Sequence, residues 1–551
     1  MKFSVLPFLI FILMNLQLFA KQYGTSFDIQ KYIETELSKG QKTIVIPKGQ
    51  YRVTPVKKQH LLLKDLKNIT IDASNVEMIC TETTRAITIL NCENLTIKGL
   101  TIDYDPLCFT KGTIVAMSPD KSTIDFRLED GYPDKLSTMK IEIFDSQTQL
   151  LRRHTYYGWQ PIQKIEDKTY RLQKATKYSF NQHVDLEKVG DVIVASSVSA
   201  PNGSIPHAVL SDNCKNLRLE NITLYSGPTF AFFETNGTSN TYYRCVIDRR
   251  PQHTDIVNRS QRLRSNNADA FHSKYAYVGP KIIECAAQFQ GDDGVNICGL
   301  YYFVISGAEN TINIISRNDM MLTKNSVIGG ITSLGKRLPD VKMLDVKETG
   351  IVNEEIKALI RKLYLHAKIK DELVEAGLKI YTITIEKPVT VDFGTLISDC
   401  NRTGNGFLVK DCNFSNNRSR GILIKASNGT VEGNKLVGNW MHSILVSPEA
   451  YWLESGCSDN VVIKDNTISN NQSKQSILID ANCISRQTPP VGIHNNISIT
   501  NNLILNSPFP VIQSVSVNGL QIENNRVDST PLIEKDHVEL VNCENVTISK
   551  N

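Results

Sequence analysis

Three aspartates in two short motifs have the residue type and spacing for acid–base chemistry. Asp269 lies in Asn-Asn-Ala-Asp-Ala-Phe-His (266–272), and Asp292 and Asp293 lie in Gln-Gly-Asp-Asp-Gly-Val-Asn (290–296). Asp269 and Asp292 are 23 residues apart. That interval is the length of one coil in a β-solenoid, in which short strands of successive coils stack on each other. We therefore expect three carboxyl groups on one face. Since like charges at that distance cannot all ionise, one pKa should rise, leaving an acid beside carboxylate bases.

Glycoside hydrolysis needs a protonated carboxylic acid beside an ionised carboxylate, because the acid protonates the leaving oxygen while a second group activates water. Two other interpretations stay open. Asp-Asp-Gly is a common turn sequence, and stacked carboxylates also bind Ca²⁺. The one-turn interval, with His272 and Asn267 beside it, favours catalysis without a metal.

The elements that must position these motifs are short strands in a repeated sequence. An apolar pair, polar residues rich in Asn, and a further apolar residue recur in segments such as 462–468, 497–504 and 520–527. Such self-similarity indicates a solenoid whose units must stack to bury their apolar faces. We predict an all-β, right-handed parallel β-helix with an inward ladder of stacked Asn side chains. The ladder residues are Asn434, Asn466, Asn502, Asn525 and Asn551, with Cys412 in the same place one unit earlier.

Two stretches lack the repeat, at about 103–197 and 303–395, and we predict that both are inserted small β-barrel-like domains. The second also has a helical pattern near 353–367. The repeat continues on both sides of each insert, so residues 21–551 are expected to form one body. The chain ends at Asn551 within a repeat, and we expect a C-terminal cap to be missing from this sequence.

The first twenty residues predict export. Lys2 precedes a nearly unbroken apolar run from 3 to 19, and the small residue Ala20 follows, which is typical of a signal peptide over residues 1–20. The mature protein is therefore expected in the periplasm or outside the cell, without stable membrane insertion. Most of the 12 cysteines lie inside apolar strand sequences, which favours free, buried thiols; Cys457 is a candidate for a loop disulfide. A net charge of +4 does not indicate a nucleic-acid partner.

The aspartate motifs on a β-helix resemble those of two glycosidase families. Polygalacturonases would also carry Gly-His-Gly and Arg-x-Lys motifs, which are absent here. The sequence more closely resembles glycoside hydrolase family 110, the inverting α-1,3-galactosidases. Besides the aspartate motifs, the resemblance involves Gly-Leu-Thr-Ile-Asp-Tyr-Asp-Pro (99–106), Ser-Arg-Gly-Ile-Leu-Ile (419–424) and Trp-Leu-Glu-Ser-Gly (452–456). It covers most of the mature chain. One departure is Cys298 before Gly299, where members of that family often have His.

The resemblance implies an inverting reaction on terminal α-linked galactose, with Asp292 as general acid and Asp269 and Asp293 holding the attacking water. It implies a glycan or oligosaccharide as substrate and no cofactor. Further residues are expected to bind sugar hydroxyls or to stack on a sugar ring: Asn267, His272, Asn296, Arg420, Trp452 and Glu454. Neither the linkage, the aglycone nor the oligomeric state follows from the sequence.

Three alternatives remain at this point. A polysaccharide lyase on the same fold would use an Arg or Lys base and Ca²⁺. A hydrolase similar to polygalacturonases would act on a different sugar. A non-catalytic glycan-binding β-helix would use the carboxylates only to hold hydroxyl groups.

Overall fold

The computed structural model describes the chain from residue 24 to residue 549 with short gaps. The residues left out within that range are 121, 137–139, 154–158, 175–185, 199–204, 318, 473–474, 529 and 533. The expected signal peptide, residues 1–20, lies outside the described residues, as does Asn551. None of the described helices is long and apolar enough to cross a lipid bilayer.

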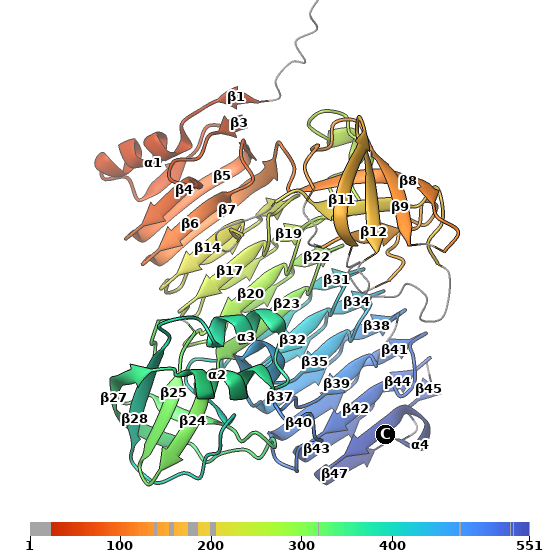
Figure 1. Cartoon of the computed structure of the whole chain (residues 1–551). Coiled ribbons are helices and arrows are strands. Elements are labelled where there is room, and N and C mark those ends of the chain that lie inside the picture. Colours follow the sequence, from red (N-terminus) through yellow and green to blue (C-terminus); the bar gives the residue numbers. More distant parts are fainter. Residues whose placement is uncertain are drawn as a thin grey trace, which may run out of the picture.

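Most of the chain winds into a parallel β-helix whose strands stack coil upon coil (Figure 1). This confirms the all-β prediction. Three ladders of parallel strands run along the stack, and apolar side chains from all three fill one continuous core. The helix α1 (Ile29–Ser38) precedes the coils and packs Ile29 and Ile33 against this core, with Asp28 as its N-cap.

The first ladder contains β2 (Thr43–Val45), β5 (Lys67–Cys80), β7 (Glu93–Tyr104), β15 (Arg218–Glu220), β18 (Thr241–Tyr243), β21 (Lys281–Ile283), β30 (Leu408–Lys410), β33 (Thr430–Glu432), β37 (Asp459–Lys464), β40 (His494–Thr500), β43 (Val517–Glu523) and β47 (Glu544–Ser549). The second shares β5 and β7 and adds β1 (Thr25–Ser26), β3 (Gly49–Val53), β16 (Thr223–Leu224), β19 (Val246–Ile247), β22 (Ala286–Gln288), β31 (Asn413–Ser415), β34 (Lys435–Val437), β38 (Thr467–Ser469), β41 (Leu503–Leu505), β44 (Arg526–Val527) and β45 (Thr530–Pro531).

The third ladder carries the aspartate motifs. Its strands are β4 (Gln59–Lys64), β6 (Arg85–Leu90), β14 (Val209–Asp212), β17 (Phe232–Thr235), β20 (Phe271–Lys274), β23 (Val295–Leu300), β32 (Ile422–Ile424), β35 (Ile444–Val446), β39 (Ile477–Ile479), β42 (Ile512–Val515) and β46 (Val538–Val541). The short helix α4 (Glu534–His537) precedes β46.

The first insert leaves the coils after β7. It forms a six-stranded antiparallel sheet, in the order β10-β13-β8-β9-β12-β11. Its strands are β8 (Phe109–Met117), β9 (Thr123–Leu128), β10 (Glu142–Phe144), β11 (Trp159–Glu166), β12 (Thr169–Lys174) and β13 (Val192–Ser196).

The second insert follows β23 and is a closed barrel, in the order β24-β25-β28-β27-β26-β29. It contains β24 (Tyr302–Ala308), β25 (Thr311–Ile315), β26 (Val327–Ile331), β27 (Val341–Ile351), α2 (Glu354–Arg361), α3 (Ala367–Leu373), β28 (Lys379–Ile385) and β29 (Leu396–Asp399). Figure 1 shows the two inserts projecting from opposite sides of the stack.

The predicted asparagine ladder is present over the described coils. The side-chain amide of Asn434 donates to Asn466 Oδ1, Asn466 to Asn502 and Asn502 to Asn525, each at 2.9 Å. The backbone N–H of Cys412 donates to Asn434 Oδ1, so Cys412 does occupy the preceding position. Since all four asparagines are buried, the ladder satisfies polar groups at each bend that water cannot reach.

All twelve cysteines are free and nine are buried, in agreement with their interpretation as small core residues. Cys457, the candidate for a disulfide, is partly exposed and also free.

Replacing Asn466 by Ala tests the ladder. The change removes Asn466 Oδ1, which accepts from both the backbone N–H and the side-chain amide of Asn434. It also removes the amide donor to Asn502 Oδ1 and Val431 O, although the backbone N–H of residue 466 still donates to Asn502. We therefore expect the free energy of unfolding to fall by about 2–4 kcal/mol. Urea denaturation followed by circular dichroism measures this loss. The matched change on the exposed side of a coil is Gln521→Ala, which should alter stability by less than about 0.5 kcal/mol. Equal stability of the two variants would contradict the ladder's role.

Candidate active site

Five residues at one end of the third ladder occupy equivalent positions on successive coils. The residues Phe232, Phe271, Val295, Ile422 and Ile444 pair with one another from coil to coil along this ladder. The residue two positions before each of them is, in coil order, Phe230, Asp269, Asp293, Arg420 and His442. Neighbouring strands are about 4.8 Å apart. The register therefore places Asp293, and not Asp292 as the sequence interval predicted, directly beside Asp269.

Asp292 and Asp293 lie in a bend just before β23 begins at Val295, so both carboxyl groups can reach the same side. The flanking glycines permit this bend by allowing neighbouring coils to come close. A Cβ at Gly291 would lie 2.6 Å from Asn267 O, and one at Gly294 would lie 2.5 Å from Gly421 O.

The three carboxyl groups form a compact cluster. One oxygen from each of Asp269, Asp292 and Asp293 lies within 4.8 Å of the others. Asp269 and Asp293 are nearly inaccessible, whereas the Asp292 side chain is 26% exposed. Asp292 is therefore the member of the trio that a bulky substrate can touch.

Cationic side chains surround the trio. Arg418 Nη2 donates to Asp292 Oδ1 at 2.6 Å, and Lys140 Nζ lies 3.6 Å from Asp292 Oδ2. Arg420 contacts Asp293 twice, through its backbone N–H at 2.8 Å and through Nη1 at 3.1 Å. The repulsion among the carboxylates is thereby offset by three nearby positive charges.

These surroundings give Asp292 and Asp293 opposite pKa shifts. Burial raises the pKa of Asp293 to about 7; Arg420 opposes this, while Asp269 and Asp292 add to it. Burial also raises the pKa of Asp292, but Arg418, Lys140 and Arg420 outweigh it, so that pKa lies below its ordinary value. The expected pKa splitting is thus present, and below about pH 7 Asp293 is the member of this pair that carries a proton in the free protein.

His272 orients Asp269. Its Nδ1 lies 2.7 Å from Asp269 Oδ2, and its ring stacks on Phe230 with centroids 4.4 Å apart. Burial lowers the pKa of His272, but the hydrogen bonds with Asp269 and Cys298 outweigh it and raise the pKa to about 10. The imidazole is therefore charged at neutral pH and donates its proton toward Asp269.

A second polar cluster adjoins the trio and centres on Lys425, which is fully buried. Lys425 Nζ contacts Glu454 Oε2 at 2.9 Å, Asn296 Oδ1 at 3.1 Å and Glu449 Oε2 at 3.1 Å. Arg420 also pairs with Glu449, which links this cluster to the trio. The predicted binding residues Asn296, Arg420 and Glu454 are therefore brought together.

The other two predicted binding residues lie differently. Asn267 is buried, and its side-chain amide donates to Cys108 O, Ser196 Oγ and Pro228 O. Its contacts with Cys108 and Ser196 hold the loop before Asp269 to the two ends of the first insert, where the insert joins the coils. Trp452 lies in the short 3₁₀ helix η2 (Ala450–Trp452), outside both polar clusters, and is 37% exposed.

Sequence reasoning missed four residues that contact these clusters: Lys140, Lys274, Arg418 and Glu449. Lys140 belongs to the first insert, more than a hundred residues from the trio, and nothing in its sequence surroundings indicates a role. The other three stand just outside the motifs singled out above, where they looked like ordinary charged residues.

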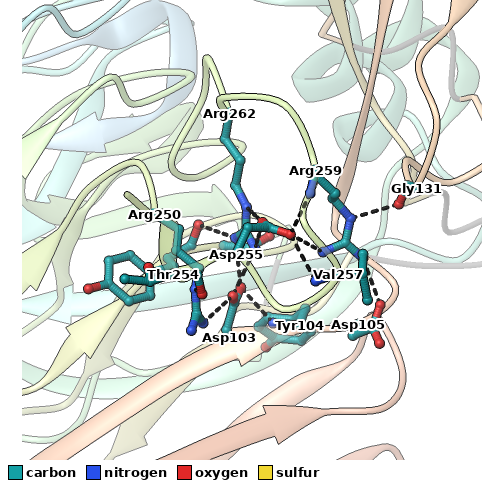
Figure 2. Close-up of polar contacts among 12 residues, drawn as sticks. Asp103, Tyr104, Asp105, Gly131, Arg250, Thr254, Asp255, Val257, Arg259 and Arg262 are labelled. Atoms are coloured by element: carbon teal, nitrogen blue, oxygen red, sulfur yellow. Dashed lines mark hydrogen bonds and ion pairs between the residues drawn. The ribbon is translucent and has the colours of Figure 1, made fainter. Parts of the chain in front are cut away.

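A buried network of arginines and aspartates anchors the loop that leads into Asp269 (Figure 2). Arg262 pairs with both Asp103 oxygens at 2.9 Å, and with Asp255 through Nε and Nη2 at 3.0 and 2.8 Å. Arg250 Nη1 adds a third contact to Asp103 at 2.8 Å. Asp103 is the end of the coil strand β7, so the network joins the loop to the β-helix core.

The same loop is held to the first insert. Arg264, fully buried, pairs with Glu142 of β10 and donates to Asn267 Oδ1 at 3.0 Å. Arg259 donates to Gly131 O at 2.7 Å. Lys140 donates to Asn267 O at 2.8 Å while facing Asp292. The insert is consequently part of the wall around the trio.

Replacing Arg262 by Ala tests the anchor. The change leaves the buried Asp103 carboxylate with one partner fewer, and we expect a loss of about 3–5 kcal/mol at pH 7. Arg262 and Arg250 hold the pKa of Asp103 below its ordinary value against the effect of burial, so Asp103 contributes stability above its unfolded pKa of about 3.9 and loses it as the pH falls. Without Arg262 the effect of burial is opposed chiefly by Arg250, so the pKa of Asp103 rises in the variant. The carboxyl group then takes up a proton as the pH falls, and the deficit of the variant should shrink toward pH 4.

Chemical denaturation at pH 7 and pH 4 measures both effects. The control is Arg244→Ala, since Arg244 forms an ion pair with Glu284 at the surface; its loss should stay below about 1 kcal/mol. A deficit for the Arg262 variant no larger than that of the control would refute the anchoring role.

The chain is similar in sequence to a known family model and to proteins of known activity. Residues 391–527 match the family model described as right handed beta helix region, which agrees with the predicted handedness. Alpha-1,3-galactosidase A of Bacteroides thetaiotaomicron is 24% identical over 90% of this chain and 84% of its own length. Alpha-1,3-galactosidase B of the same organism is 23% identical over 95% and 87%.

Among solved structures, the A-module of the Azotobacter vinelandii mannuronan C-5 epimerase AlgE4 is similar, with a TM-score of 0.41 and 10% identity, covering 96% of each chain. The chain is thus a right-handed β-helix protein related, over about nine tenths of its length, to bacterial proteins named alpha-1,3-galactosidase.

Proposed function

We propose that this protein is an exo-acting glycoside hydrolase that removes terminal α-linked galactose from glycans. The observation that carries the proposal is the cluster of Asp269, Asp292 and Asp293, in which neighbouring carboxyl groups have opposite pKa shifts. The long alignments with alpha-1,3-galactosidases support the choice of sugar. The trio supplies the acid and the base, and the Lys425 cluster supplies groups that bind sugar hydroxyls.

Asp292 is assigned as the general acid because it is the exposed carboxyl group, and proton transfer requires contact with the glycosidic oxygen. In the free protein Arg418 and Lys140 keep Asp292 ionised. Contact with the substrate removes water from this carboxyl group, which raises its pKa, and the proton held by the trio then resides where it is needed.

Asp269 and Asp293 are assigned to the attacking water. Both are buried, so a water molecule can approach them where a sugar cannot. His272 fixes the orientation of Asp269, and Arg420 fixes that of Asp293. The three cations around the trio also disfavour Ca²⁺ there, because its carboxylate oxygens are already paired with positive charges.

The decisive experiment combines turnover with product stereochemistry. The proposed reaction inverts the anomeric centre, as the resemblance implies. The wild-type protein should therefore release galactose from an aryl α-galactoside, with the β-anomer appearing first in the NMR spectrum. The close approach of the three carboxyl groups, within 4.8 Å, is nearer to the separation of about 5–5.5 Å in retaining enzymes than to about 6.5–9.5 Å in inverting ones. The anomer therefore tests a part of the proposal that rests on the resemblance alone.

Replacing Asp292 by Asn tests the acid. We expect kcat/KM to fall by about 10²–10⁴-fold on an alkyl α-galactoside, but much less on a dinitrophenyl α-galactoside, whose leaving group needs no protonation. Asp293→Asn is the comparison, because loss of a water-holding group should impair both substrates alike. The reverse pattern would transfer the acid role to Asp293. Unchanged turnover by both variants would exclude the roles assigned to the two carboxyl groups. No turnover by the wild-type protein would leave only glycan binding, and an unsaturated product with its ultraviolet absorbance would indicate a lyase.

The pH dependence of kcat/KM follows from the shared proton. The active trio carries one proton, and the pKa of about 7 at Asp293 marks where the free protein loses it. We therefore expect kcat/KM to decline above pH 7, approaching tenfold per pH unit, since this parameter reports the free enzyme. Initial rates between pH 5 and pH 9 measure the decline. A profile that stays level up to pH 9 would contradict the predicted proton on the trio.

A further inference from the structure

Four aromatic side chains form a patch beside the Lys425 cluster that neither the trio nor its cations require. We call it the outer aromatic patch: Tyr364, His366, Tyr451 and Trp452. Tyr364 and His366 lie between α2 and α3 of the second insert, whereas Tyr451 and Trp452 lie in η2 of the coil stack. The patch therefore forms where the insert meets the β-helix.

The rings of the patch are in mutual contact. His366 stacks on Trp452 with centroids 3.9 Å apart and an interplanar angle of 25°. Tyr451 meets Trp452 edge-on at 5.5 Å and lies 5.0 Å from Tyr364. The guanidinium of Arg486 covers the Tyr364 ring at 4.4 Å. Each of the outermost rings is thus supported on one face by another side chain.

The patch is open to solvent despite this support. Tyr364 is 44% exposed and Trp452 is 37% exposed, and both are among the few large apolar residues on the surface of the described chain. His366 stacks on the Trp452 indole and Arg486 lies over Tyr364, yet more than a third of each aromatic residue stays accessible. An aromatic ring that is held in place and still partly exposed can stack on a sugar ring.

The position of the patch is fixed by the packing beneath it. The backbone N–H of His366 donates to Tyr451 O at 3.0 Å, and Arg317 joins Trp452 O to Glu372 of α3. Below the rings, Leu365 and Ile369 of the insert pack in one apolar cluster with Ala450 and Leu453 of the coil. The rings are therefore held in place before any ligand arrives, which lowers the entropic cost of binding.

The patch continues directly into the proposed active site. Glu454 follows Trp452 by two residues, a span of at most about 7 Å of chain. Glu454 contacts Lys425, and its Oε1 lies 4.0 Å from His272 Nε2. Glu454 therefore connects the patch with the residues around the trio, so that a saccharide of several rings can contact both.

We propose that the outer aromatic patch is a binding subsite for a further sugar of the substrate, beyond the scissile galactose, and that the second insert thereby selects oligosaccharides over small galactosides. This inference rests on the proposed function, because it takes the aspartate trio as the place of cleavage. The ligand is a neutral pyranose ring stacked through its apolar C–H face. The insert contributes Tyr364 and His366 to the subsite, and the coil contributes Trp452.

The test compares two substrates across three tyrosine variants. For Tyr364→Ala we expect the ratio of kcat/KM for a galactose-terminated tetrasaccharide to that for an aryl α-galactoside to fall about five- to tenfold, mainly through KM. Tyr364→Phe keeps the ring and should keep the wild-type ratio. Tyr277→Ala is the matched control, since Tyr277 is 49% exposed and has the Arg402 guanidinium 4.2 Å from its ring, but lies outside the patch. It should also keep the wild-type ratio.

An unchanged ratio for Tyr364→Ala would overturn the proposal, as would an equal fall for Tyr277→Ala. If the wild-type protein cleaves no α-galactoside, the proposed function fails, and the patch is then tested by binding. Quenching of tryptophan fluorescence by the same tetrasaccharide should weaken in Tyr364→Ala and persist in Tyr277→Ala. Equal binding by both variants would refute the subsite irrespective of catalysis.

Discussion

The spacing between neighbouring coils is the constraint on which the site depends. Strand register places Asp269 and Asp293 side by side at about 4.8 Å, and the bend before β23 adds Asp292. Three carboxyl groups so close together, mostly out of water, repel one another, and burial raises the free energy of each charge. The fold can keep this arrangement only by supplying positive charge or a proton. It supplies both, through Lys140, Arg418, Arg420 and the charged His272, and through the raised pKa of Asp293.

The cations come from different parts of the chain because a single coil cannot present them all. Arg418 and Arg420 lie on the coil after the aspartates, within a register that the solenoid repeats. Lys140 comes from the first insert, and its position depends on how that insert docks. The contact of Arg262 with Asp103 anchors the loop before Asp269 to the coil (Figure 2). The contact of Arg264 with Glu142 holds the insert to the same loop. Buried arginine pairs that do not themselves contact Asp292 thus help to position the charge beside it.

Features that depend on short, repeated stretches of sequence could be predicted, whereas contacts between distant segments could not. A repeated sequence reports the same strand and bend many times, so the β-helix, the Asn434 to Asn525 ladder and the place of Cys412 were all readable. The closeness of the aspartates was also readable, although a count of 23 residues paired Asp269 with Asp292 when the ladder pairs it with Asp293. One residue in the bend accounts for the difference, and composition gives no signal for it.

Contacts between the inserts and the coils could not be predicted from the sequence. Asn267 looked like a sugar ligand because it adjoins Asp269, yet its amide is fully used on Cys108, Ser196 and Pro228, which the insert brings near. Lys140 has no motif at all. The signal that positions these side chains is tertiary docking, to which neither periodicity nor spacing in the chain is sensitive.

The two polar clusters differ in burial, and this difference suits the Lys425 cluster to binding and the aspartate trio to proton transfer. The Lys425 cluster is assembled before substrate arrives, since Lys425 is fully buried and already satisfied by Glu449, Glu454 and Asn296. Its carboxylates can accept sugar hydroxyls without reorganising, which favours orientation over charge transfer. The trio is different, because its exposed member, Asp292, has ion pairs that a substrate must weaken. In the proposed reaction, binding at the rigid cluster and at the proposed aromatic subsite of the second insert supplies the free energy for that change at the trio.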